Sequence, residues 1–203
     1  MPIAAVIFDA FGTLLQIGKG LSPYKNIIKL GIEQGRRPKA SDVIDLLSKP
    51  MDLRQAADFY GIHVSSRYMY QLESDLQREL ASIQAYPDGI AAVAGLKAFG
   101  LKVIVCSNLA QPYALPIERL YPELDGYVYS FSVGAIKPSF EIYDRAAQLA
   151  GASPREIWMI GDSERCDCAG PTEFGMHGHF LDRTGVTGYR SLDEFALAVL
   201  RAR

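Results

Sequence analysis

The fold of this chain is decided by one stretch near its start, Val6-Ile7-Phe8-Asp9-Ala10-Phe11-Gly12-Thr13-Leu14. A short apolar run over residues 4–8 predicts a buried strand, and it ends abruptly in the carboxylate of Asp9. Gly12 then allows a tight reversal, because glycine adopts backbone conformations that other residues avoid. Taken alone, the stretch fits either a functional carboxylate at Asp9 or an ordinary turn. Motifs elsewhere in the chain are needed to distinguish the two.

Further apolar runs predict four more strands, at residues 101–106, 127–131, 157–160 and 179–181. Helical patterns lie among them, at residues 89–99, 139–150 and 191–201. Strands that alternate with helices favour an α/β fold with a parallel sheet covered on both faces. In such a sheet, ligands bind beyond the carboxyl ends of the strands.

Polar side chains follow these predicted strands and therefore indicate one crevice. Asp9 and Ser107 come directly after an apolar run, and Asp162 follows another after Gly161. Asn108 follows Ser107, and Lys137 lies beyond the strand at 127–131. Although they are far apart in sequence, we expect all five to converge at the same edge of the sheet.

The stretch from residue 16 to residue 85 breaks the alternation, because it has no convincing strand pattern. Its helical patterns cover residues 24–34, 40–48, 53–60 and 66–83. We interpret residues 16–85 as an inserted helical cap that lies over the crevice as a lid. Residues 1–15 and 86–203 would form the core.

The composition excludes several classes of function. The 203 residues are 49% hydrophobic and carry a net charge of −2, so nothing favours binding to nucleic acid or to an anionic membrane. No apolar stretch approaches the roughly 18 residues of a membrane-spanning helix. The apolar start lacks a basic region and contains Asp9, so we expect a strand and a cytoplasmic protein. Three cysteines do not predict a disulfide framework.

Four motifs in this order resemble those of the haloacid dehalogenase-like (HAD) hydrolase superfamily, with a cap inserted after the first motif. They are Asp9-x-Phe11-Gly12, Ser107-Asn108, Lys137-Pro138, and the pair of Asp162 and Asp167. The resemblance covers essentially the whole chain. It implies a Rossmann-like core and a small-molecule substrate, with the protein either a monomer or a homodimer.

The resemblance also implies roles for individual residues. Asp9 would be the nucleophile, Ser107 would bind the transferring group with Asn108 beside it, and Lys137 would neutralise negative charge. Phe11 and Thr13 would lie on the substrate side of the first motif.

A magnesium ion is implied in most members of the superfamily. Here Asp9, Asp162, Asp167 and the backbone carbonyl of Phe11 would hold it. The chemistry of the residues agrees, because three carboxylates in one crevice repel one another and need compensating positive charge. A divalent cation together with Lys137 would supply that charge.

Phe11 departs from the pattern of the superfamily's phosphatases. Those enzymes carry at this position a second aspartate, which protonates the leaving group, whereas a phenyl ring transfers no protons. Loss of such a step costs about 10²–10⁴-fold in rate. Tyr24 of the cap is a candidate replacement as proton donor.

The superfamily's dehalogenases carry an aromatic residue at this position and displace halide, which needs no proton. An arginine after the first motif holds the halide or carboxylate, and Arg36 and Arg37 are candidates by location. Those enzymes work without metal and usually lack the first aspartate of the fourth motif, whereas this chain keeps both Asp162 and Asp167.

Three hypotheses therefore stay open. The leading one is a magnesium-dependent, phosphatase-like hydrolase that acts on a small phosphorylated metabolite. The second is a 2-haloacid dehalogenase, in which the aspartate attacks carbon. The third is a non-catalytic binding or regulatory protein built on the same scaffold.

Overall fold

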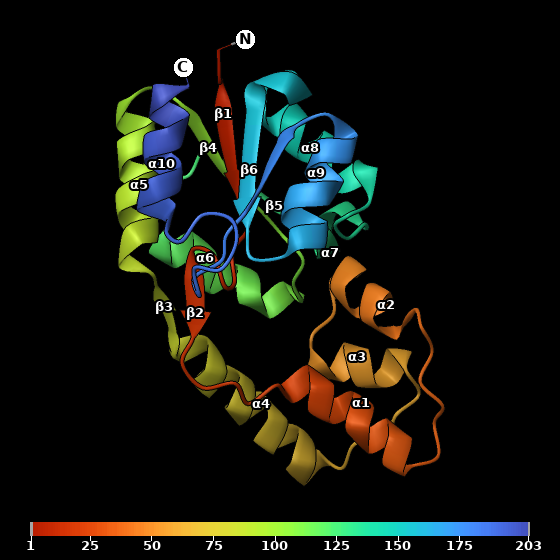
Figure 1. Cartoon of the computed structure of the whole chain (residues 1–203). Coiled ribbons are helices and arrows are strands. Elements are labelled where there is room, and N and C mark those ends of the chain that lie inside the picture. Colours follow the sequence, from red (N-terminus) through yellow and green to blue (C-terminus); the bar gives the residue numbers. More distant parts are fainter. Residues whose placement is uncertain (1, 203) are drawn as a thin grey trace.

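A computed structural model describes residues 2–202 and contains a five-stranded parallel sheet (Figure 1). The strands lie in the order β5-β4-β1-β6-β7. Their bounds are β1 (Ala5–Phe8), β4 (Lys102–Ser107), β5 (Gly126–Tyr129), β6 (Ile157–Gly161) and β7 (His177–Phe180). The predicted α/β fold with a parallel sheet is confirmed.

The register of the sheet brings the carboxyl ends of its three central strands together. Phe8, the last residue of β1, pairs with Val105 of β4 on one side and with Ile160 of β6 on the other. The residues that follow these strands consequently emerge at the same edge.

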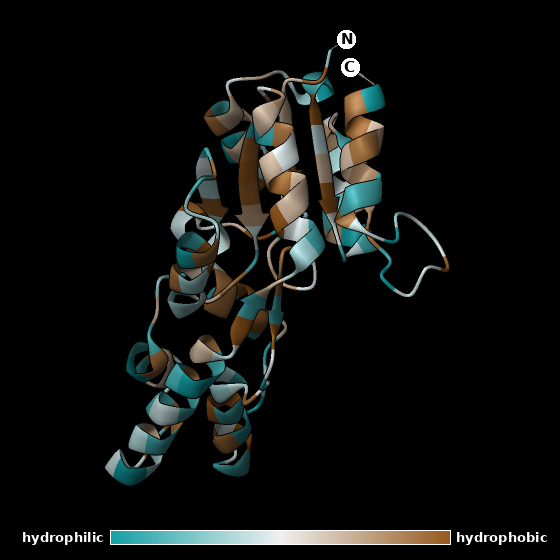
Figure 2. Cartoon of the chain, turned by 90° about the vertical axis from the view of Figure 1, so that its left-hand side faces the viewer, coloured by the Kyte–Doolittle hydropathy of each residue, from teal (hydrophilic) through white to brown (hydrophobic). Residues whose placement is uncertain are grey.

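Side chains of β1 alternate between two apolar layers, as the period of a strand requires. Val6 and Phe8 pack in the layer that contains α5 (Pro87–Ala98), α6 (Ala114–Leu120) and α10 (Leu192–Arg201). Ala5 and Ile7 pack in the layer of α8 (Phe140–Ala150). Figure 2 shows that the strands of the sheet are mostly hydrophobic, whereas hydrophobic and hydrophilic residues are mixed along the helices. No helix in residues 2–202 has the length and apolar character needed to cross a membrane.

A separate group of helices lies beyond the carboxyl ends of the strands (Figure 1). They are α1 (Pro23–Glu33), α2 (Asp42–Ser48), α3 (Leu53–Phe59) and α4 (Ser66–Ala81). Their apolar faces form a third cluster, which includes Ile27 and Leu72 and also Ala110 from the core. We call residues 18–82, which carry these four helices, the helical insertion.

The prediction that residues 16–85 contain no strand is wrong. β2 (Leu15–Ile17) and β3 (Ile83–Ala85) pair antiparallel at the two ends of the helical insertion. Strands of three residues are too short to show an alternating pattern, and each finds its partner only through tertiary structure. The connection therefore enters and leaves the core through one two-stranded stem.

The other elements differ from the predicted ranges by a few residues at their ends. β5 ends at Tyr129 because the short helix α7 (Ser130–Val133) starts directly after it. β7 begins at His177, before the predicted start at residue 179. The remaining short elements are η1 (Gln111–Tyr113), η2 (Pro154–Glu156), the π-helical turn η3 (Glu164–Ala169) and α9 (Gly170–Phe174).

Candidate active site

The structure brings the residues that were predicted to share a crevice to one place. Asp9 follows β1, and its N–H donates to the carbonyl of Ile160 at 2.9 Å, which ties it to the end of β6. Ser107 is the last residue of β4, and Lys137 comes from the segment after α7. Asp167 lies in η3, directly beyond β6.

Lys137 is the ionic centre of this site. Its Nζ donates to Asp9 Oδ1 at 2.8 Å, to Asp167 Oδ1 at 2.6 Å and to the carbonyl of Cys106 at 2.9 Å. Burial alone would lower the pKa of Lys137, but the carboxylates of Asp167 and Asp9 hold it well above its ordinary value. The ammonium group therefore stays charged and is shared by two of the three carboxylates, whose combined negative charge it offsets only in part.

Asn108 holds the lysine in place through the backbone. Its Nδ2 donates to the carbonyl of Lys137 at 3.0 Å, and its Oδ1 accepts from the N–H of Lys137 at 2.8 Å. Both side-chain groups of Asn108 are thus engaged with the lysine segment. The amide fixes the point from which the Lys137 side chain extends toward Asp9.

Two hydroxyl groups approach the carboxylate of Asp9. Ser107 Oγ donates to Asp9 Oδ1 at 3.1 Å, and Thr13 Oγ1 lies 3.5 Å from Asp9 Oδ2. Thr13 Oγ1 also accepts from the N–H of Asp162 at 3.2 Å. Thr13 is fully buried and bridges Asp9 and Asp162, so it does not lie on the substrate side, where the resemblance leads us to expect it.

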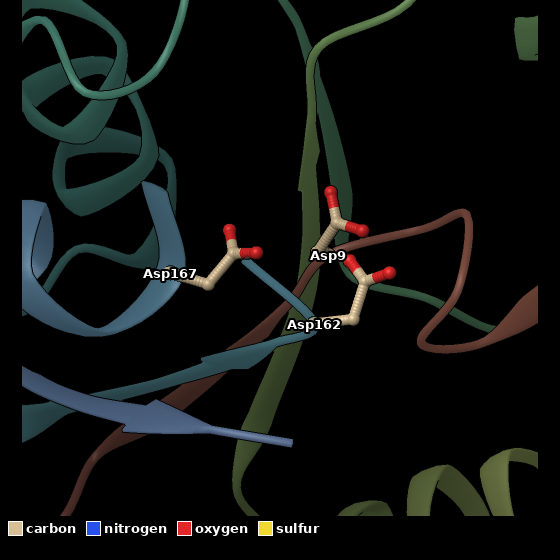
Figure 3. A group of neighbouring side chains, drawn as sticks. All are labelled: Asp9, Asp162 and Asp167. Carbon is tan, nitrogen blue, oxygen red and sulfur yellow. The ribbon is translucent and has the colours of Figure 1, made fainter. Parts of the chain in front are cut away.

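Asp9, Asp162 and Asp167 form a carboxylate cluster, with one oxygen from each within 4.8 Å of the others (Figure 3). Asp162 is the exposed member of the cluster, and partial desolvation, followed by the charge of Asp9, raises its pKa. Burial also raises the pKa of Asp167, although Lys137 opposes this. Such oxygen ligands, held together against their repulsion, fit a magnesium ion.

Gly12 is required for the close approach of the first motif to this cluster. Its φ of +85° lies in the left-handed region, and a Cβ at this position would overlap the carboxylate of Asp162. A side chain at residue 12 would therefore push the Asp162 carboxylate away from the cluster.

The site residues line a cleft of about 250 Å³ together with Phe11, Ser163 and Cys166. No arginine lines this cleft in the part of the chain that the structure describes. Arg36 is engaged within the helical insertion, where it forms two hydrogen bonds with Asp42 at 2.7 and 2.6 Å. Arg37 is exposed.

Tyr24 is also engaged within the helical insertion. Its hydroxyl donates to the carbonyl of Met51 at 2.8 Å, and burial, together with the charge of Asp52, raises its pKa. The group expected to supply a proton is therefore committed to another acceptor.

Arg183 supports the site, and sequence reasoning missed it. Its guanidinium donates to the carbonyl oxygens of Thr13 at 2.7 Å and Gly12 at 3.3 Å. It also forms two hydrogen bonds with the carboxylate of Asp88. The guanidinium carbon lies 3.9 Å from the centre of the Tyr86 ring. An isolated arginine after the last strand belongs to no motif, so no sequence pattern points to this contact.

A family model for haloacid dehalogenase-like hydrolases matches residues 3–175. The chain belongs to this family and is a hydrolase. Among curated relatives, (S)-2-haloacid dehalogenase 4A of Burkholderia cepacia is 25% identical over 197 residues, which cover 90% of this chain and 84% of the relative.

Solved HAD structures share the fold. A HAD phosphatase from Thermococcus onnurineus superposes with a TM-score of 0.65 at 24% identity, covering 97% of this chain and 98% of that one. A HAD family enzyme from Bacteroides thetaiotaomicron, in complex with magnesium and inorganic phosphate, gives a TM-score of 0.65 at 16% identity, over 89% and 94% of the two chains. Proteins similar to this HAD hydrolase are thus named both as dehalogenases and as phosphatases.

Proposed function

We propose that this HAD hydrolase is a magnesium-dependent phosphatase that transfers the phosphoryl group of a small phosphorylated metabolite to Asp9 and then to water. The observation that carries the proposal is the cluster of Asp9, Asp162 and Asp167 around one position. Displacement of halide requires no such cluster, whereas phosphoryl transfer concentrates negative charge that a cation stabilises.

Magnesium would be held by the three carboxylates and by the backbone carbonyl of Phe11. When bound, it would neutralise charge on the transferring phosphoryl group. The magnesium and inorganic phosphate in the related Bacteroides thetaiotaomicron enzyme support this assignment for the shared fold.

In the proposed reaction, one carboxylate oxygen of Asp9 attacks phosphorus, while Lys137 and Ser107 donate hydrogen bonds to Asp9 Oδ1. A new bond forms between Asp9 and phosphorus while the bond from phosphorus to the leaving oxygen breaks, and that oxygen keeps the electron pair. Water then attacks phosphorus and releases inorganic phosphate and the free Asp9 carboxylate, giving its proton to solvent. Lys137 and Ser107 hold Asp9 and the anionic oxygens throughout.

The side chain of Phe11 sets the kind of leaving group. No proton donor occupies its position, and Tyr24 is committed to Met51. We therefore expect efficient turnover only where the leaving oxygen departs without protonation, as in aryl and acyl phosphates. Residues 16–85 would act as the cap that excludes water, over a core of residues 1–15 and 86–203.

A second candidate is the hydrolysis of a carbon–halogen bond. The aromatic Phe11 favours it, as do the curated dehalogenases at 25% identity. In this reaction Asp9 attacks carbon, halide leaves, and water cleaves the resulting ester. The absence of an arginine among the cleft residues in the described chain weighs against it.

The test is phosphate release from aryl, acyl and sugar phosphates, with magnesium and with a chelator, for the wild type and for Asp9→Asn. We expect magnesium-dependent release that Asp9→Asn abolishes. Halide release from 2-chloropropionate, insensitive to the chelator, would instead establish the second candidate. Activity in neither assay, with Asp9→Asn matching the wild type in stability and ligand binding, would leave a binding protein.

A further inference from the structure

An apolar pocket of about 350 Å³ lies beside the catalytic cleft, and Phe11 lines both. The core contributes Leu109 and Tyr113, and the helical insertion contributes Leu46 and Leu47. The rings of Phe11 and Tyr113 meet edge to face, with their centres 5.9 Å apart. A group bonded to a phosphoryl unit at Asp9 would therefore enter a space walled by aromatic and branched side chains.

Three polar side chains in the wall of this pocket are already engaged with protein atoms. The hydroxyl of Tyr113 donates to Glu79 Oε1, and Glu79 Oε2 accepts the N–H groups of Leu21 and Ser22. The hydroxyl of Tyr24 donates to Met51, as described above. The hydroxyl groups of a sugar would find few partners here, and burying them unpaired is unfavourable.

Two polar groups of the pocket stay available, and both lie at the start of α1. Within residues 2–202, Lys25 forms no ion pair and the hydroxyl of Ser22 has no hydrogen-bond partner. Lys25 is exposed, so its ammonium group can reach an anion at the mouth of the pocket. The pocket is thus apolar along most of its lining, with the Glu79 carboxylate already accepting three hydrogen bonds and the Lys25 ammonium group left without an ion pair among the described residues.

We infer that the substrate is an aryl phosphate that carries a second anionic group, with its ring beside Phe11 and Tyr113 and its anion at Lys25. This inference rests on the proposed phosphatase reaction. A cavity of about 150 Å³ holds one benzene ring, so the volume of this pocket accommodates a substituted ring. Phe11 points to the same class independently, because a phenolate leaves without a proton donor.

The first experiment compares kcat/KM for four phosphates: 4-carboxyphenyl phosphate, phenyl phosphate, glucose 6-phosphate and acetyl phosphate. We expect the carboxylated aryl phosphate to exceed phenyl phosphate by about 5- to 10-fold, and the sugar phosphate by 100-fold or more. Turnover of acetyl phosphate with no preference for aryl over sugar phosphate would overturn the inference and leave the proposed function standing. Turnover of none of the four would overturn both.

The second experiment tests Lys25 directly. In Lys25→Gln the preference for 4-carboxyphenyl phosphate over phenyl phosphate should fall to about 1, because the added carboxylate loses its cation. Lys29→Gln, which alters another exposed lysine of α1, should keep the preference. Equal preference in the wild type and in Lys25→Gln would overturn the placement of the anion.

A binding measurement gives a readout separate from turnover. Calorimetry with 4-carboxyphenylphosphonate and phenylphosphonate, in the presence of magnesium, should show tighter binding of the carboxylated compound by the wild type and equal binding by Lys25→Gln. Ile17→Trp, which enlarges a side chain in the pocket wall, should weaken both phosphonates. Unchanged affinity of Ile17→Trp for both would exclude the pocket as the site of the ring.

Discussion

The guanidinium of Arg183 and the carboxylate of Asp88 are joined by two hydrogen bonds, of 2.9 and 3.2 Å. Asp88 also accepts the N–H of Leu192, at the start of α10. Arg183 also contacts the carbonyls of Gly12 and Thr13. The pair therefore connects α5, the segment after β7 and the start of α10 with the turn after Asp9. The arrangement predicts that Arg183 stabilises both the fold and the geometry of Asp9, the proposed nucleophile.

Replacing Arg183 with methionine should lower the free energy of unfolding by about 2–3 kcal/mol, because Asp88 loses its cation and two carbonyls lose a donor. Urea unfolding monitored by the fluorescence of Trp158 measures this. Arg54→Met removes the more exposed pair with Glu73 and should cost less than about 1 kcal/mol. A similar small loss for both variants would contradict a supporting role for Arg183.

Lys137 is buried between Asp9 and Asp167, so Lys137→Met should abolish activity and lower stability by about 3–5 kcal/mol. Millimolar magnesium should raise the melting temperature of this variant more than that of the wild type, since a cation relieves the uncompensated carboxylates. Lys97→Met, at the more exposed pair with Asp125, is the control and should show neither effect. A magnesium response no larger than that of the wild type would argue against an ion at this cluster.

Phe11→Asp would place a carboxyl group where the chain now has a phenyl ring. Turnover of an alkyl phosphate should rise by about 10-fold or more, because its alkoxide leaving group needs a proton, while an aryl phosphate should gain little. Phe11→Leu is the control for loss of the ring and should show no such gain. If Phe11→Asp turns over alkyl phosphates no faster than the wild type does, protonation of the leaving group is not the missing step.

His179 makes stability depend on pH. Its ring centre lies 4.3 Å from that of Trp158, and its Nε2 is buried without a hydrogen-bond partner among the described residues. Burial, aided by the charge of His177, lowers the pKa of His179 to about 4. An unfolded histidine has a pKa of about 6.5, so the unfolded chain binds the proton more readily between these values. Stability is therefore fully present above pH 6.5 and is lost as pH falls toward 4, by about 1–2 kcal/mol after allowance for partial exposure.

Urea midpoints of the wild type and of His179→Phe, measured at pH 7.5 and pH 5, test this dependence. The variant should lose less stability on acidification, whereas His63→Gln, at an exposed histidine, should behave like the wild type. Identical losses for His179→Phe and the wild type would rule out His179 as the origin of the effect.

Much of the core was predictable because parallel strands that are buried on both faces leave continuous apolar runs. The same rule placed Asp9 and Ser107 together, since their positions depend only on where the strands end. Lys137, which follows α7 and not a strand directly, was expected at the same edge. Features that depend on partners distant in sequence were not predictable. β2 and β3 are too short to show a pattern, and the contacts of Arg183 exist only in the folded chain.

Two residues that the sequence made candidates for the active site have side chains bound elsewhere in the structure. Tyr24 and Arg36 carry groups suited to proton donation and anion binding, and their place after the first motif made them candidates. Inside the helical insertion, Tyr24 donates a hydrogen bond to the carbonyl of Met51, and Arg36 forms an ion pair with Asp42. Nearness along the chain to a catalytic motif does not determine which face of a helix a side chain occupies.

The two-stranded stem has a consequence for how this protein can change over evolutionary time. Both passages of the chain between the core and the helical insertion run side by side, with Leu15 opposite Ala85 and Ile17 opposite Ile83. An insertion attached in this way can be lengthened, shortened or exchanged as a cassette, because its ends already lie close together. The proposed chemistry at Asp9 and the proposed substrate selection by the helical insertion can then diversify at separate rates within one gene.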